Sequence, residues 1–153
     1  MSAFDRLSAC AGSWRGTNRL QDPHTNAADE SPSSLVVNPV LGGRFVRLDY
    51  TWAYHGKPQE GSLLVGRDAK PGEVTAHWID SWHMGDTVMA CRGAAVDNGA
   101  LSVRGSYAAP PGPDWGWRTT ITPDGGDALR VVMYNVTPDA QEQLAVEASY
   151  TRA

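Results

Sequence analysis

Hydrophobic and polar residues alternate with a period of two along much of the chain. One run places five large hydrophobic residues on one face of a segment: Val46, Leu48, Tyr50, Trp52 and Tyr54. The same spacing groups Val74, Ala76, Trp78, Asp80 and Trp82 in a second segment, and Leu144, Val146, Ala148 and Tyr150 in the last. Because successive side chains of a β-strand point to opposite faces, this period predicts strands with one buried and one solvated face.

Turn residues divide the chain at nearly regular intervals. Its 16 glycines and 10 prolines argue against a helix bundle, because both residues destabilise helix interiors. Nine turn segments predict ten strands. Most of these segments are too short for a crossover helix, so neighbouring strands should be antiparallel. Residues 22–34 and 109–114 are longer polar or proline-rich stretches, expected as loops at a barrel rim or lid.

Only the first dozen residues look helical. Ser2 is a suitable N-cap with Asp5 three residues later, Phe4 and Leu7 fall on one face, and Gly12 is expected to stop the helix. The whole pattern predicts an all-β fold, a ten-stranded antiparallel up-and-down β-barrel with a short N-terminal helix, as one domain over residues 1–153. A β-sandwich is the alternative, but a meander closes readily and closure removes exposed strand edges.

Composition and charge narrow the function classes. Hydrophobic residues make up 41% and charged residues 20%, which is typical of a globular chain. The net charge of −4 comes with no basic patch, so we expect no nucleic-acid partner. No apolar run is long enough for a membrane helix and no signal-peptide region opens the chain. Cys10 and Cys91 are the only cysteines, too few for a disulfide scaffold, so a cytoplasmic protein is expected. Among protein partners, a second copy of the chain, in a homodimer, is possible.

Residues 12–16, Gly-Ser-Trp-Arg-Gly, resemble the Gly-x-Trp signature of lipocalins and their calycin relatives. In those barrels the tryptophan closes one end, and an arginine near the end of the last strand lies over it. The resemblance implies that Trp14 and Arg152 form this structural contact here. A guanidinium over an indole face contributes roughly 0.5–2 kcal/mol.

More of the chain resembles one narrower family. Residues 39–46, 60–68, 77–82 and 150–152 are similar, in the same order, to segments of a bacterial family known only as a domain of unknown function. That family has a calycin-like β-barrel, akin to lipocalins and fatty-acid-binding proteins. The resemblance therefore implies this fold and, by analogy, a cavity for a small molecule.

The segment His77-Trp-Ile-Asp-Ser-Trp-His83 is the richest chemical cluster. If the face with Asp80 points inward, a carboxylate lies between two indoles and needs a partner, for which Arg118 or Arg44 would serve. Such a group is a ligand anchor, an acid/base group, or a structural aspartate bonded to turn backbone or an indole N–H. The alternation alone leaves open which face of this strand lines the cavity.

The sequence predicts no metal site and no cofactor. The four histidines show no His-x-His or His-Glu-x-x-His spacing, and His77 and His83 are too far apart in one strand to share an ion. Some small calycin-like barrels, of the nitrobindin type, bind haem through a histidine on a late strand. No histidine follows His83, so haem is a disfavoured alternative.

We therefore expect a barrel that binds a small hydrophobic or aromatic ligand, planar or partly apolar, in an aromatic-lined cavity. The candidate ligand-binding residues are Trp52, Trp78, Asp80, Trp82, Arg118 and Tyr134. Trp115 and Trp117 are expected to line the cavity mouth or to cap the barrel. Two other hypotheses stay open: an enzyme with Asp80 as acid/base, and an interaction module that binds no small molecule.

Overall fold

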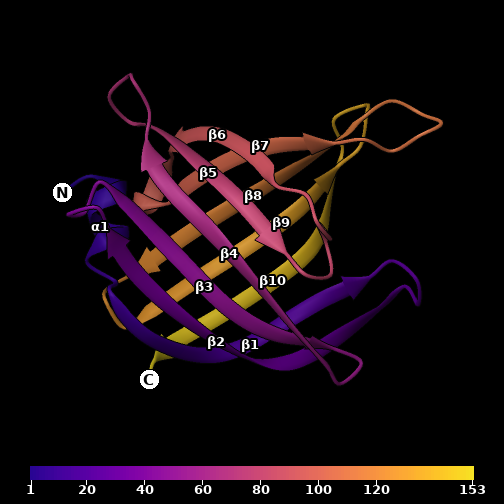
Figure 1. Ribbon diagram of the computed structural model, residues 1–153, viewed down its shortest axis with the longest axis horizontal. Coiled ribbons are helices and arrows are strands. Elements are labelled where there is room, and N and C mark those ends of the chain that lie inside the picture. Colours follow the sequence, from indigo (N-terminus) through magenta and orange to yellow (C-terminus); the bar gives the residue numbers. More distant parts are fainter.

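The period of two in the sequence corresponds to ten consecutive strands that close into an antiparallel barrel (Figure 1). The computed structural model describes all 153 residues. After helix α1 (Ala3–Ser8), the strands are β1 (Gly12–Asp22), β2 (Ala27–Val40), β3 (Phe45–Tyr54), β4 (Lys57–Arg67), β5 (Glu73–Asp80), β6 (Met89–Ala95), β7 (Leu101–Tyr107), β8 (Trp115–Asp124), β9 (Ala128–Val136) and β10 (Glu142–Arg152). Each strand pairs with its sequence neighbours, and β1 pairs with β10. The predicted fold class is confirmed.

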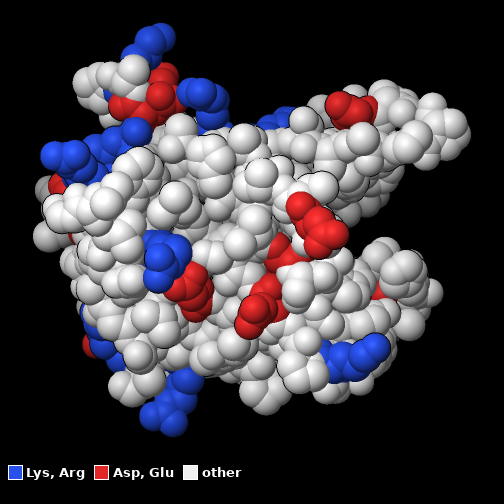
Figure 2. Space-filling view, in the orientation of Figure 1, with Lys and Arg blue, Asp and Glu red and all other residues white.

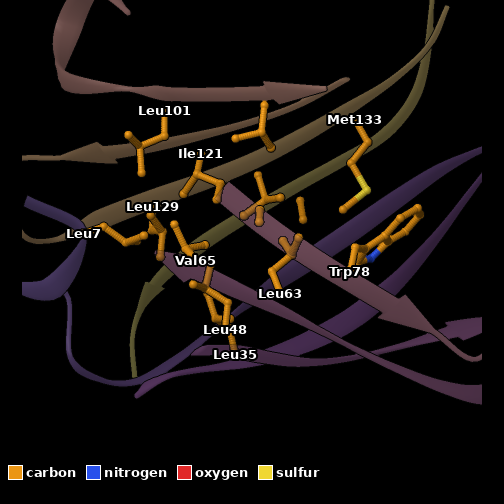
Figure 3. Packing of buried hydrophobic residues seen from close by; sticks show 14 of the residues in the cluster. Leu7, Leu35, Leu48, Leu63, Val65, Trp78, Leu101, Ile121, Leu129 and Met133 are labelled. Carbon is orange, nitrogen blue, oxygen red and sulfur yellow. The ribbon is translucent and has the colours of Figure 1, made fainter. Parts of the chain in front are cut away.

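Alternate residues of every strand fill the interior. Leucine, isoleucine and valine side chains from facing strands meet along the axis, with Leu35, Leu48, Leu63 and Ile121 almost fully buried (Figure 3). In β5 the side chain of Asp80 is buried while that of Ile79 is exposed, so the face that carries Trp78 and Asp80 is the inner one.

Two strand predictions are wrong in detail. Residues 27–34 are not a loop but the first part of β2, because they pair along their whole length with β1, from Asp22↔Ala27 to Arg15↔Ser34. Pairing with a neighbour overrides the low strand propensity of this polar stretch. In β10 the register shifts between Leu144 and Val146, so Ala145 rather than Leu144 points inward and Leu144 is 45% exposed.

Helix α1 covers one end of the barrel, which we call the closed end. A capping box forms as expected: the Ser2 hydroxyl accepts from the Asp5 N–H, and the Asp5 carboxylate accepts from the Ser2 N–H. The helix ends at Ser8, before the predicted stop at Gly12, and buries Phe4 and Leu7 against the strands. No helix is long and apolar enough to cross a membrane.

Trp14 and Arg152 seal this end together. The Trp14 indole is buried and donates its Nε1–H to the Cys10 carbonyl at 2.8 Å. The Arg152 guanidinium carbon lies 4.5 Å from the centroid of the Trp14 ring. The same guanidinium donates to the carbonyls of Ala11 (2.8 Å), Gly126 (3.0 Å) and Ala9 (3.2 Å). The last strand is thereby tied to the segment that follows α1.

We predict that Arg152→Ala lowers the free energy of unfolding by about 1–3 kcal/mol, since it removes a cation–π contact and three charge-assisted hydrogen bonds. Urea unfolding followed by tryptophan fluorescence measures this. Arg130→Ala is the matched control. Arg130 pairs with Glu147 on the outer surface, and the expected loss is only about 0–1 kcal/mol. A loss at Arg152 no larger than at Arg130 would contradict the sealing role.

Candidate functional site

The middle of the barrel has almost no free space. The cavity there measures about 20 Å³ and is walled mainly by apolar side chains, among them Leu35, Leu48, Leu63 and Met133. This is room for about one water molecule. A ligand of the expected size therefore has no place in the interior as it stands, and the expected aromatic cavity has to be sought at an end of the barrel.

Asp80 is the polar centre of the inner face. Its side chain is 3% exposed, and its carboxylate accepts four hydrogen bonds. Oδ2 accepts from the Tyr50 hydroxyl at 2.6 Å and from Trp52 Nε1 at 3.2 Å. Oδ1 accepts from the backbone N–H groups of Trp82 and His83, each at 2.8 Å. Neutral donors thus satisfy both oxygens, and they fix the turn that ends β5.

Tyr50 extends this network by one step. Its hydroxyl donates to Asp80 and accepts from Trp78 Nε1 at 2.9 Å. Tyr50 reaches Asp80 across β4 because Gly61, its partner in the register, has no side chain; a Cβ there would lie 2.2 Å from the Tyr50 hydroxyl oxygen. Burial, and then the charge of Asp80, raise the pKa of Tyr50 well above its ordinary value, so the phenol stays protonated.

The cationic partner expected for Asp80 is absent. Arg118 lies on the outer face of β8, where its Nε and Nη2 donate to Glu142 at 2.5 and 2.9 Å. Its guanidinium also lies 4.4 Å from the ring centroid of Tyr134, which faces outward from β9. Arg44 is exposed in the turn before β3. The predicted pairing is wrong because the inner carboxylate is satisfied by neutral donors, and Arg118 and Tyr134 do not line the interior.

The open end of the barrel, opposite α1, carries an aromatic cleft. Figure 2 shows a notch there, between the projections made by the β7–β8 loop and the β1–β2 hairpin. The cleft has two lobes of about 610 and 320 Å³ that share part of their lining. We define this open-end cleft by Trp78, Trp82, His83, Tyr107, Trp117 and Asn135. Its volume matches that of typical small-molecule sites.

His83 lies among indole rings at the base of the open-end cleft. Its ring centroid is 4.7 Å from that of Trp82, 5.4 Å from those of Trp78 and Trp117, and 5.6 Å from that of Trp52, on which it stacks. Its ring nitrogens make no hydrogen bond within the protein, since only its backbone N–H is bonded, to Asp80. Burial lowers the pKa of His83, and the Asp80 charge opposes this only in part, so the imidazole is neutral at pH 7.

Two further groups in the cleft have unused donors. Trp117 is 5% exposed, and its Nε1–H is the one buried side-chain polar atom of the chain without a hydrogen-bond partner. Asn135 is its register partner on β9. The Asn135 Oδ1 accepts from the Tyr107 hydroxyl, which leaves the amide NH₂ without a protein acceptor. The two donors thus belong to residues that are paired on neighbouring strands and that both line the cleft.

Asp22 places a fixed negative charge beside the smaller lobe. Its carboxylate is buried and accepts from the His24 backbone N–H at 2.8 Å, and its other oxygen lies 3.0 Å from His55 Nε2. Burial opposes ionisation, but these hydrogen bonds outweigh it and hold the pKa of Asp22 at about 2. Neither lobe of the cleft is lined by a lysine or an arginine.

The structure divides the predicted site residues into three sets. Trp52 and Trp78 join Asp80 in one buried network, Trp52 directly and Trp78 through Tyr50, and Trp82 follows Asp80 along the chain into the open-end cleft. Arg118 and Tyr134 lie outside. His83 and Asn135 were missed as ligand-binding candidates, since their role depends on neighbours from distant strands. Trp117 could be found from the sequence, because two tryptophans at positions i and i+2 after a proline-rich loop predict a cavity mouth or a cap of the barrel.

No group of three or more His, Cys, Asp or Glu side chains is placed to hold a metal ion. The open-end cleft also does not match a haem site of nitrobindin type. No histidine lies on β8, β9 or β10, His83 is the one histidine shared by both lobes, and no lysine or arginine lines the cleft to pair with the carboxylates of a haem.

We predict that Asp80→Asn destabilises the fold by about 1–3 kcal/mol, because the new NH₂ faces the Tyr50 and Trp52 donors in a buried place. Urea unfolding measures the change. Asp49→Asn is the control on the outer face, where Asp49 bonds to Arg47 and Ser62, and about 0–1 kcal/mol is expected. Unchanged stability of Asp80→Asn would show that the carboxylate is not a structural anchor.

A second prediction concerns pH. His83 has a lowered pKa in the fold, so below its ordinary value of 6.5 the unfolded chain binds the proton more readily. The free energy of unfolding should therefore fall between pH 7.5 and 5.5, and fall less in His83→Gln. His77→Gln, at an exposed position of β5, should keep the wild-type dependence. Equal pH dependence in wild type and His83→Gln would contradict burial of a neutral imidazole.

Comparison with known proteins agrees with the barrel. A crystal structure of Rv2717c from M. tuberculosis is similar with a TM-score of 0.66 and 19% identity, covering 100% of this chain and 98% of that one. An S-type phycobiliprotein lyase, CPES from Guillardia theta, is similar with a TM-score of 0.66 and 12% identity, covering 100% and 93%. No curated protein matches the sequence.

At these identities both similarities show the fold alone. The model of one family, described as a protein of unknown function (DUF1579), matches residues 2–152, almost the entire chain. This confirms the resemblance to a calycin-like family without an assigned activity. The chain belongs to the DUF1579 family.

Proposed function

We propose that this protein binds a planar, partly apolar small molecule in the open-end cleft. The observation that carries the proposal is a cleft of ligand size walled in part by Trp117, whose buried indole N–H has no acceptor within the protein. A buried donor without a partner costs free energy, and a ligand acceptor would recover it.

The lining supports a flat ligand. Trp82 and Tyr107 are only partly buried, so each leaves ring surface at the cleft. Met84 and Met89 add flexible apolar surface to the same lobe. Aromatic rings favour offset or edge contacts with another ring, and each such pair contributes about 0.5–1.5 kcal/mol beyond area burial.

Of the expected residues, Trp78 and Trp82 remain in the proposed binding surface. Trp52 and Asp80 take a supporting role, because they fix the turn that carries Trp82 and His83. The enzyme hypothesis with Asp80 as acid/base has less support. The Asp80 carboxylate accepts four hydrogen bonds from groups of the protein itself and is not free to exchange a proton with a substrate.

The test is a titration of intrinsic tryptophan fluorescence with a panel of flat bicyclic and tricyclic compounds, followed by calorimetry for those that bind. We predict that Trp82→Ala weakens binding by about 10- to 100-fold, because it removes a cleft wall. Trp115→Ala is the matched control: Trp115 lies on β8 but does not line the cleft, and affinity should stay within about 3-fold. A panel without a binder, or Trp82→Ala binding like wild type, would refute the proposal.

A further inference from the structure

We infer that the ligand is an uncharged ring system with a carbonyl group on its edge, as in a lactam, and not a carboxylate such as a fatty acid. This inference rests on the proposed function, because it concerns the chemistry of the same cleft. It is based on the hydrogen-bonding groups of the cleft that have no partner within the protein.

The unused groups are mostly donors, and two of them belong to residues that are paired in the register. Trp117 and Asn135 are register partners with side chains on the inner face, and such pairs have Cβ atoms about 5 Å apart. Because the Asn135 oxygen already accepts from Tyr107, its NH₂ is the part of the amide that has no partner at all within the protein. Two donors on paired residues of one wall suit one acceptor oxygen, which a carbonyl supplies with two lone pairs.

His83 adds a mixed group next to these donors. A neutral imidazole has one N–H and one acceptor nitrogen, and neither is used by the protein. The ring lies 5.4 Å from the Trp117 ring, centroid to centroid. A lactam edge, with its C=O beside an N–H, complements two donors and one acceptor on the same wall.

The charges of the cleft disfavour an anionic ligand. No lysine or arginine lines either lobe, and the ionised Asp22 carboxylate borders the smaller one. A carboxylate that enters such a site loses its hydration without gaining a cation, which makes its burial costly. A neutral carbonyl needs less solvation and is satisfied by the two donors.

Three probes of similar size separate these terms: 2-quinolone, which is a neutral lactam, naphthalene, which has no acceptor, and 2-naphthoate, which is an anion. We expect 2-quinolone to bind about 10-fold more tightly than naphthalene, the value of about one net hydrogen bond. We expect 2-naphthoate to bind no better than naphthalene. Calorimetry or fluorescence titration gives the three dissociation constants.

Asn135→Asp is the informative variant, because the carboxylate can still accept from Tyr107 but the NH₂ donor is lost. It should weaken the affinity for 2-quinolone about 10-fold and change the affinity for naphthalene by less than about 3-fold. Trp117→Phe should act in the same direction. Asn38→Asp is the control, because it adds the same charge on the outer face of β2, outside the cleft lining. It should change the affinity for neither probe.

The outcomes keep the two proposals apart. If none of the three probes binds, both the proposed function and this inference fail. If all three bind equally, or 2-naphthoate binds most tightly, the cleft binds ligands but the lactam inference is overturned. If Asn135→Asp weakens 2-quinolone and naphthalene alike, the amide does not recognise the carbonyl and the inference is likewise overturned.

Discussion

The open end of this barrel depends on one buried carboxylate. Asp80 joins β3 to β5 through Tyr50 and Trp52, and it ends β5 by accepting the backbone N–H groups of the next turn. That turn carries Trp82 and His83 into the cleft. A buried charge is tolerated here because four neutral donors replace water, and their geometry determines where the aromatic rings lie.

A second constraint decides where a ligand can bind. Inward leucines, valines and tryptophans fill the middle of the barrel, and helix α1 with Trp14 and Arg152 closes one end. The opposite end keeps a cleft of useful volume that is walled by aromatic rings. The buried hydrogen-bonding groups around Asp80 all have partners, whereas the indole N–H of Trp117 has none. The one buried group that lacks a partner therefore belongs to a residue of the cleft.

The sequence predicts the barrel well, because a period of two and frequent turns leave few other folds, and a terminal arginine matches the tryptophan of the first strand. It predicts the site less well. Tyr50 is 30 residues from Asp80, and only the missing side chain of Gly61 lets them meet. An acidic residue between indoles suggested a cation, yet neutral donors serve equally well. The bulge beside Leu144 leaves no mark in the alternation.

The central claim is that the ligand site lies at the open end of the barrel and not in its interior. A crystal structure with bound 6-bromo-2-quinolone, located by the anomalous signal of bromine, tests this most directly. We expect a bromine peak in the open-end cleft, with the ring near Trp82 and the carbonyl near Trp117 and Asn135. A peak between Leu48 and Leu63 in the middle of the barrel, or on the outer face near Arg118 and Tyr134, would contradict it.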